Sequence, residues 1–210
     1  MTSQTGIICA IALNCAIVIM ETIALCMTIK KDGAGLFKYY TDDSNLFALV
    51  TGIIFLITAI QAVVTRSFMV PAWVRVLRLM TTAMLMVTFI VVITVLAPSR
   101  NPGGYRKMLL KAQMKYVHLL CPLVSFVSFV LFEGAPALAP GTSLVAMIPT
   151  VIYAVIAISM NITRKLDGPY PFLRVHEQPV YMSIIWTVVI IGGAWAAGLG
   201  IWRLSDLLAG

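Results

Sequence analysis

Six long apolar runs decide what this chain can fold into. A helix that crosses the hydrocarbon core of a membrane needs about 20 mainly apolar residues. Inside that core the backbone must satisfy its own hydrogen bonds, which favours helices. The loops between the runs are too short for a soluble domain. We therefore predict an all-α integral membrane protein, with residues 1–210 forming one bundle of six transmembrane helices. The predicted spans are residues 6–29, 44–65, 73–97, 116–133, 143–161 and 180–202.

The composition is that of a membrane protein, and the placement of the cysteines argues against a metal site or a disulfide framework. The chain is 60% hydrophobic and 11% charged, against roughly 45–50% and about 25% in soluble domains. We expect the first run to be a mature span rather than a signal peptide, because no basic residues precede it. All four cysteines fall inside predicted helices without metal-type spacing, so we predict no metal site, no cofactor and no disulfide framework.

Lysine and arginine predict the orientation of the bundle, since cytoplasmic loops carry an excess of them. Eleven of the fifteen basic residues fall at loops 30–43, 98–115 and 162–179, which we therefore predict to be cytoplasmic, with both termini outside. The net charge of +7 is then explained by loops at the membrane surface, and no nucleic-acid partner is expected. The eleven are Lys30, Lys31, Lys38, Arg100, Arg106, Lys107, Lys111, Lys115, Arg164, Lys165 and Arg174, and the other four are Arg66, Arg75, Arg78 and Arg203.

Three polar stretches converge on this basic side of the membrane. "YYTDDSN" enters the second span, "KYVHLLCP" enters the fourth, and "RKLDGPYPFLRV" joins the fifth to the sixth. Because all three belong to loops on one side, their side chains are expected to surround one pocket that opens toward that face.

The histidine of the fourth span is the first candidate for chemistry. Ionisable groups within a span are costly and often functional. Pro122 lies four residues after His118, so it removes the hydrogen bond to the His118 carbonyl and predicts a bend there. Lys111 and Lys115 precede His118 on the same helical face. The alternative is an interfacial histidine beside lysines that reach toward the headgroups.

Thr41 allows two interpretations. A threonine before an apolar helix, followed by Asp42 and Asp43, is a typical N-cap with acids in the first turn. The other interpretation makes its hydroxyl a nucleophile, which requires a base. His118 is the plausible base at that membrane level, and Asn45, four residues on, could stabilise a developing oxyanion.

A buried carboxylate and a stiff loop complete the set of polar features. Glu21 lies inside the first span with Asn14 on the same face, so it should be protonated or partnered. It either orients His118 or locks helices together. Two prolines and a glycine stiffen the loop around Tyr170, whose side chain suits a membrane interface.

Taken together, these motifs resemble one protein family over essentially the whole chain. "FKYYTDDSN" before the second span, a histidine and nearby proline opening the fourth, and "DGPYPF" before the sixth are similar to the androgen-induced and androgen-dependent TFPI-regulating proteins and their prokaryotic six-span relatives. The resemblance implies a multi-pass hydrolase of lipid metabolism that uses an intramembrane threonine and histidine. It implies fatty acid esters of hydroxy fatty acids, or similar lipid esters, as substrates within membrane lipids.

Carried onto this sequence, the resemblance implies Thr41 as the nucleophile and His118 as its base. Substrate-binding residues are expected to be Ser44, Asn45, Lys115 and Tyr170, with Lys111 and Lys38 also placed to meet a substrate carboxylate. The adjacent acids Asp42 and Asp43 depart from the eukaryotic members and would repel such a carboxylate, which bears on substrate identity more than on reaction type.

Other function classes remain open from the residues alone. A small transporter or channel for an organic anion could use Asn14, Glu21 and the basic mouth, although transporter sites favour the midplane of repeats. A haem or quinone electron carrier would need a second histidine within the spans. A receptor or scaffold without chemistry is the last alternative.

Overall fold

The computed structural model describes residues 4–100, 102–134, 138–139 and 141–209. Within these residues every regular element is helical. The predicted all-α bundle with six spans is confirmed, because six helical segments are long and apolar enough to cross a membrane. These segments are Gln4–Lys31, Tyr40–Val64, Ala72–Leu96, Tyr116–Glu133, Thr142–Ile162 and Val180–Leu208.

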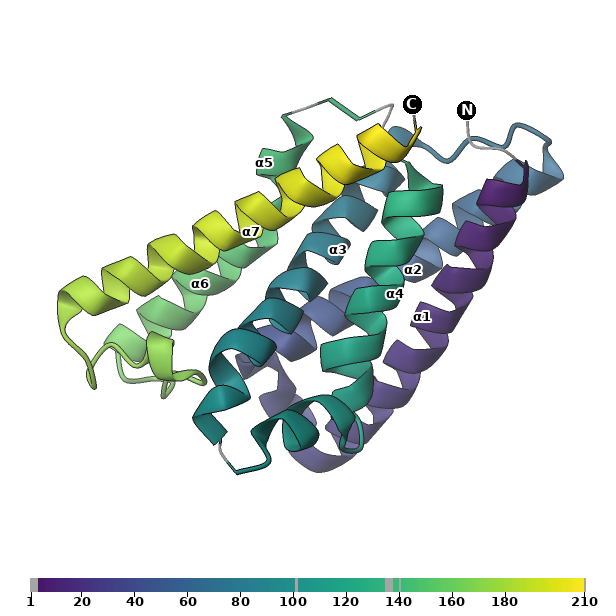
Figure 1. Cartoon of the computed structure of the whole chain (residues 1–210). Helices are drawn as coiled ribbons and strands as arrows, with labels where there is room; N and C mark the ends of the chain where they lie inside the picture. Colours follow the sequence, from purple (N-terminus) through teal and green to yellow (C-terminus); the bar gives the residue numbers. More distant parts are fainter. Residues whose placement is uncertain (1–3, 101, 135–137, 140, 210) are drawn as a thin grey trace.

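The bundle is organised around its third helix. Helix α3 contacts α2, α4, α5 and α7, while α1 packs along α2 and α4. Both chain ends lie at one end of the bundle (Figure 1), as an even number of spans requires. The three loops that carry the polar stretches, before the second, fourth and sixth spans, therefore share the other end. The helices are α1 (Gln4–Asp32), α2 (Tyr40–Val64), α3 (Ala72–Val91), α4 (Cys121–Ser128), α5 (Thr142–Ala146), α6 (Ile148–Ile162) and α7 (Val180–Ala209).

The outer surface of the spans is apolar. Large aliphatic side chains such as Ile57, Ile19 and Val188 are more than half exposed, although a soluble protein rarely leaves extended apolar surface in water. Lipid chains would cover these side chains in a membrane. The exposed apolar surface thus supports the same multi-pass assignment as the length of the helices.

The fourth span accommodates its proline by changing helix type. Its first turn is a π-helix, Tyr116–Leu120, and the Cys121 N–H donates to the Tyr116 carbonyl five residues before it. Pro122 lacks the N–H that would continue the α-helical ladder at this point, and a π turn is one way in which a membrane helix adjusts to such a residue. The bend that the sequence predicts near His118 therefore takes the form of a π turn.

An ion pair is buried near the end of the bundle that holds the termini. Arg78 of α3 donates to both carboxylate oxygens of Glu133, with Nε–Oε2 at 2.9 Å and Nη2–Oε1 at 3.1 Å, and both side chains are fully buried. Asn14 and Ser128 also donate to Oε1 of Glu133, at 2.9 and 2.7 Å. The sequence analysis counted Arg78 among the basic residues on the side of the termini, and the structure keeps it toward that end but buries it inside the bundle.

The ion pair extends into a wider polar network between α1, α3 and the fourth span. Ser125 accepts from Nη2 of Arg78 at 3.2 Å and shares a 2.8 Å hydrogen bond with Thr82. The Arg78 guanidinium also lies 6.0 Å from the centre of the Phe55 ring. Buried charges are stable only when they are paired and hydrogen-bonded, so this network ties three spans together.

Candidate functional site

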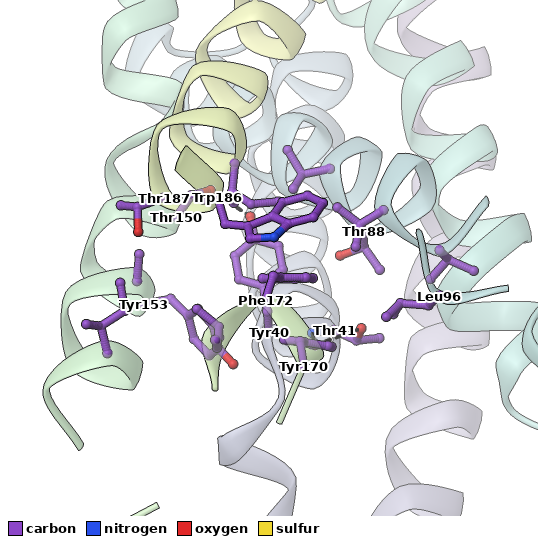
Figure 2. A pocket seen from close by; sticks show the side chains of 17 residues that line it. Tyr40, Thr41, Thr88, Leu96, Thr150, Tyr153, Tyr170, Phe172, Trp186 and Thr187 are labelled. Carbon is purple, nitrogen blue, oxygen red and sulfur yellow. Dashed lines mark hydrogen bonds between the residues drawn. The ribbon is translucent and has the colours of Figure 1, made fainter. Parts of the chain in front are cut away.

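An aromatic pocket lies at the loop end of the bundle, where α2, α3, α6 and α7 meet the loop before α7 (Figure 2). Its cavity volume is about 40 Å³. The side chains around it are of two kinds. Rings come from Tyr40, Tyr153, Tyr170, Phe172 and Trp186, and hydroxyls come from Thr41, Thr88, Thr150 and Thr187.

Thr41 reaches this pocket from the first turn of α2. The helix begins at Tyr40, and its N-cap is Tyr39, which makes no side-chain cap hydrogen bond. The interpretation of Thr41 as the N-cap is therefore wrong, because the helix starts before it. Asp42 and Asp43 do lie in the first turn, where they suit the helix dipole. The Thr41 hydroxyl is thus free of a capping role.

The loop before α7 carries Tyr170 to Thr41, and the loop is held in a fixed shape. Asn161 at the end of α6 donates to the Leu166 carbonyl at 3.0 Å and accepts from the Val175 N–H at 2.9 Å. Gly168 packs so closely that a Cβ there would lie 2.7 Å from the backbone of Leu173. Only glycine fits this turn without displacing the segment that positions Tyr170.

Thr41 and Tyr170 are hydrogen-bond partners. The Thr41 N–H donates to the Tyr170 phenol at 3.3 Å, and the two hydroxyl oxygens lie 3.5 Å apart, which is long. Burial raises the pKa of Tyr170 to about 12, against a smaller opposite effect of its hydrogen bonds with Thr41. The phenol therefore keeps its proton at neutral pH. It can accept from the Thr41 amide while donating toward the Thr41 oxygen.

The raised pKa of Tyr170 predicts a loss of stability in alkali. A folded pKa of about 12 above an unfolded value of about 10 gives stability that is complete below pH 10 and lost as the pH rises toward 12. We expect the melting temperature of Tyr170→Phe to fall less steeply than that of the wild type between pH 10 and 12. Thermal scans of the purified protein measure this. Tyr181→Phe, at an exposed site, is the matched control, and parallel curves for Tyr170→Phe and wild type would contradict the prediction.

His118 lies in the π-helical first turn of the fourth span, which packs against α1, α2 and α3. Its ring is buried, and Nδ1 lies 2.7 Å from the Met108 carbonyl oxygen. A carbonyl oxygen can only accept, so Nδ1 must carry the hydrogen. In the neutral ring, Nε2 then holds the lone pair, and this is the tautomer that a general base needs.

Thr41 and His118 belong to neighbouring elements but are not joined directly. Among the described residues no hydrogen bond links the two side chains, since Thr41 pairs with Tyr170 and His118 with Met108. His118 does not line the aromatic pocket. The structure thus brings together Thr41 and Tyr170 of the residues that the sequence singles out, and it places the histidine outside their cavity.

The remaining expected substrate-binding residues surround Thr41 in part. The Ser44 hydroxyl donates to the Thr41 carbonyl at 2.8 Å, and the Asn45 amide donates to the same oxygen at 2.6 Å. Both side chains therefore stabilise the first turn of α2. The Lys115 ammonium lies 4.8 Å from the centre of the Tyr116 ring and does not line the pocket.

Glu21 is buried beside the fourth span. The Cys121 thiol lies close to its carboxyl group, yet neither carboxyl oxygen reaches hydrogen-bond geometry in the described part of the chain. Cys121 lies three residues after His118, on the same side of the helix. Glu21 therefore packs against the histidine's own helix, but no hydrogen bond from Glu21 orients the His118 ring.

The sequence interpretation missed most of the pocket wall. Thr88, Thr150 and Trp186 lie within apolar runs of three different spans, where one polar or aromatic residue resembles ordinary packing. Their one recognisable signal is a threonine inside an apolar span, since such hydroxyls pair with backbone or with other spans. Thr150 illustrates this, because its hydroxyl lies 2.6 Å from that of Tyr40.

Metal-ligating side chains do not gather at this site. In the described ranges, His, Cys, Asp and Glu residues form no group of three that could hold a metal ion. The chemistry available at the pocket itself is that of hydroxyls and backbone amides, and the His118 imidazole lies outside it.

Comparison of the chain with protein-family models, with curated proteins and with solved structures gives no match. The family resemblance of its motifs therefore stays a prediction, and the case for function depends on the residues of the site.

Proposed function

We propose that this chain is an intramembrane lipid ester hydrolase with Thr41 as its nucleophile and His118 as its general base. The observation that carries the proposal is the position of Thr41 in the wall of the aromatic pocket, where its hydroxyl lies beside the Tyr170 phenol and caps no helix. The tautomer of His118 supports it, because the Met108 carbonyl fixes the hydrogen on Nδ1. A third group that orients the base is the usual arrangement around an activated nucleophile.

The proposed reaction transfers the acyl group twice, first from the ester to Thr41 and then from Thr41 to water. Nε2 of His118 takes the Thr41 hydroxyl proton, directly or through one water, as the oxygen attacks the ester carbonyl carbon. The leaving alcohol receives that proton, and the acyl group remains on Thr41. A water then gives a proton to His118 and attacks the acyl-threonine carbonyl. As the bond to Thr41 breaks, His118 returns this proton to the Thr41 oxygen, and the fatty acid is released. Resting structures often hold such groups further apart than the substrate complex does.

The oxyanion in both steps would meet the Tyr170 phenol. The phenol oxygen lies 3.5 Å from the Thr41 hydroxyl oxygen, and its hydrogen can turn toward the oxyanion while the Thr41 N–H donates to the phenol oxygen at 3.3 Å. Preorganised donors of this kind stabilise developing negative charge. The Asn45 amide, the first candidate from sequence, is engaged by the Thr41 carbonyl, so we assign this role to Tyr170 instead.

The experiment that tests the proposal is hydrolysis of a lipid ester panel by purified protein in nanodiscs. The panel should include fatty acid esters of hydroxy fatty acids, monoacylglycerols and a short-chain chromogenic ester. We expect release of free acid, and we expect a fluorophosphonate probe to label the peptide that contains Thr41. If no ester is cleaved and no probe is attached, the hydrolase proposal is overturned.

His118→Ala tests the assigned base. We expect it to lower kcat/KM by about 10²–10⁴-fold, the usual contribution of general base catalysis. Added imidazole should restore part of that activity if the missing function is proton transfer. His176→Ala is the matched control, since the chain's other histidine lies in the exposed loop before α7. Equal losses in both variants would remove His118 from the mechanism.

The loops before α2, α4 and α7 are proposed to be cytoplasmic, with the pocket near that face. Arg78 is buried against Glu133, so it is no longer a charge of the opposite surface, and the basic bias toward these loops becomes stronger. A C-terminal reporter active outside the cytoplasm is the expected result. Signal from the cytoplasmic side would reverse the orientation.

A further inference from the structure

A second and larger cavity lies beside the aromatic pocket, between α2, α3 and α6. Its volume is about 460 Å³, which is within the usual range for ligand sites of roughly 300–1,000 Å³. The aromatic pocket, at about 40 Å³, has room for only a few waters, each of which needs about 10–15 Å³. A lipid chain therefore has no place in the pocket itself, and the neighbouring cavity is where one fits.

The larger cavity, here called the lateral groove, is apolar along its length and polar at one end. Its apolar lining comes from α2, α3 and α6 and includes Phe47, Met84, Ile152 and Ala157. Lys38 and Asp43 mark the polar end. These two residues lie on either side of Thr41 in the sequence, so the polar end of the groove adjoins the first turn of α2.

The surroundings of the lateral groove determine what can occupy it. Its lining residues on α2, α3 and α6 fall within the proposed spans, and Ile152 is 54% exposed on the outer surface. At that depth the neighbouring medium is the hydrocarbon of the bilayer. Lys38 lines the polar end, and a lysine ammonium suits the carboxyl or ester end of a chain. An acyl chain with a carboxyl or ester group matches both the apolar length and the polar end of the lateral groove.

Two tyrosines form the wall between the lateral groove and the aromatic pocket. Tyr40 and Tyr153 line both cavities, and their rings meet edge to face with centroids 5.2 Å apart. Tyr40 is buried and fixed by the 2.6 Å hydrogen bond with Thr150. Tyr153 is half-buried and donates one hydrogen bond, at 2.9 Å, to the Lys38 carbonyl in the loop before α2. Tyr153 is therefore the movable part of the wall.

From these contacts we propose that the lateral groove is the acyl-chain subsite of the enzyme and that Tyr153 separates it from Thr41 until substrate enters. The inference rests on the proposed hydrolase function for its catalytic consequence, but chain binding can be measured without any hydrolysis. The chain lies between α2, α3 and α6, with its carbonyl end at Lys38, and displacement of the Tyr153 ring opens the way to Thr41.

The direct test is photo-crosslinking with a diazirine-bearing palmitic acid in nanodiscs, read by mass spectrometry of the labelled peptides. We expect labels on the segments that line the groove. Ile152→Trp should fill the groove from its exposed side and reduce labelling about tenfold. Val155→Trp is the matched control, because Val155 is also exposed on α6 but lines neither cavity. Equal labelling of the two variants would overturn the subsite.

The role of Tyr153 is tested by chain-length dependence. Tyr153→Phe keeps the ring and removes the hydrogen bond to the Lys38 carbonyl, so we expect the ratio of kcat/KM for long-chain esters to kcat/KM for a short-chain ester to rise several-fold. An equal change for both esters would contradict the role of Tyr153 as the wall between the lateral groove and Thr41. The two proposals fail separately: labelling of the groove without hydrolysis keeps the chain site and rejects the enzyme, whereas hydrolysis that Ile152→Trp leaves unchanged keeps the enzyme and rejects the subsite.

Discussion

Thr41→Ala is expected to reduce lipid ester hydrolysis by roughly 10³-fold or more, because it removes the oxygen that forms the acyl intermediate. The substitution deletes only the hydroxyl and the methyl group, so the pocket wall and the Tyr170 phenol remain in place. The measurement is kcat/KM for the best ester of the panel, together with intact-protein mass spectrometry for trapped acyl-enzyme. No acyl adduct should form on the variant.

The fold should tolerate this change, which makes the activity result interpretable. Thr41 caps no helix, since Tyr39 holds the N-cap position of α2. Its side chain makes one long contact, 3.5 Å to Tyr170, so we expect the melting temperature to fall by no more than a few degrees. Thr41→Ser keeps the nucleophile and should retain activity within about tenfold. A Thr41→Ala protein that hydrolyses esters at the wild-type rate would exclude Thr41 as the nucleophile.

The spans could be predicted from the sequence because the membrane imposes both their length and their apolarity. The fourth predicted span coincides with Tyr116–Glu133, and the others begin or end within a few residues of the observed bounds. The start of α2 was predicted too late in the sequence. A threonine followed by two acids resembles an N-cap, but the short helix Gly33–Lys38 brings the chain into α2 early, so that Tyr40 is already helical.

The candidate site could be predicted only in part. Two of the three polar stretches meet as expected and bring Thr41 and Tyr170 together, since topology determines which loops share a membrane face, but the stretch that holds Lys115 and His118 does not line their pocket. Which spans supply the pocket wall depends on helix packing order, which apolar sequences do not encode visibly. For the same reason the pairing of Arg78 with Glu133 was not foreseen, although an arginine several residues inside an apolar run is itself a signal of burial.

Glu133→Ala is expected to destabilise the protein by about 3–5 kcal/mol, because it leaves the Arg78 guanidinium buried without its carboxylate. The Arg78 side chain is fully buried, and its Nη1 already lacks a hydrogen-bond partner among the described residues. The neutral Ser125 hydroxyl would still accept from Nη2, but it does not compensate the charge. Asn14 and Ser128 lose the same oxygen. Chemical or thermal unfolding in a fixed detergent compares the variant with the wild type.

The matched control replaces both charges at once. Arg78→Met combined with Glu133→Leu removes the pair without leaving an uncompensated charge, and such exchanges are often neutral or stabilising. We therefore expect the double variant to be more stable than Glu133→Ala and to retain ester hydrolysis, because the network lies toward the termini while Thr41 lies at the loop end. If the double variant unfolds as readily as the single one, packing rather than charge pairing determines stability here. If it folds but loses hydrolysis, the ion pair contributes to the reaction as well as to the fold.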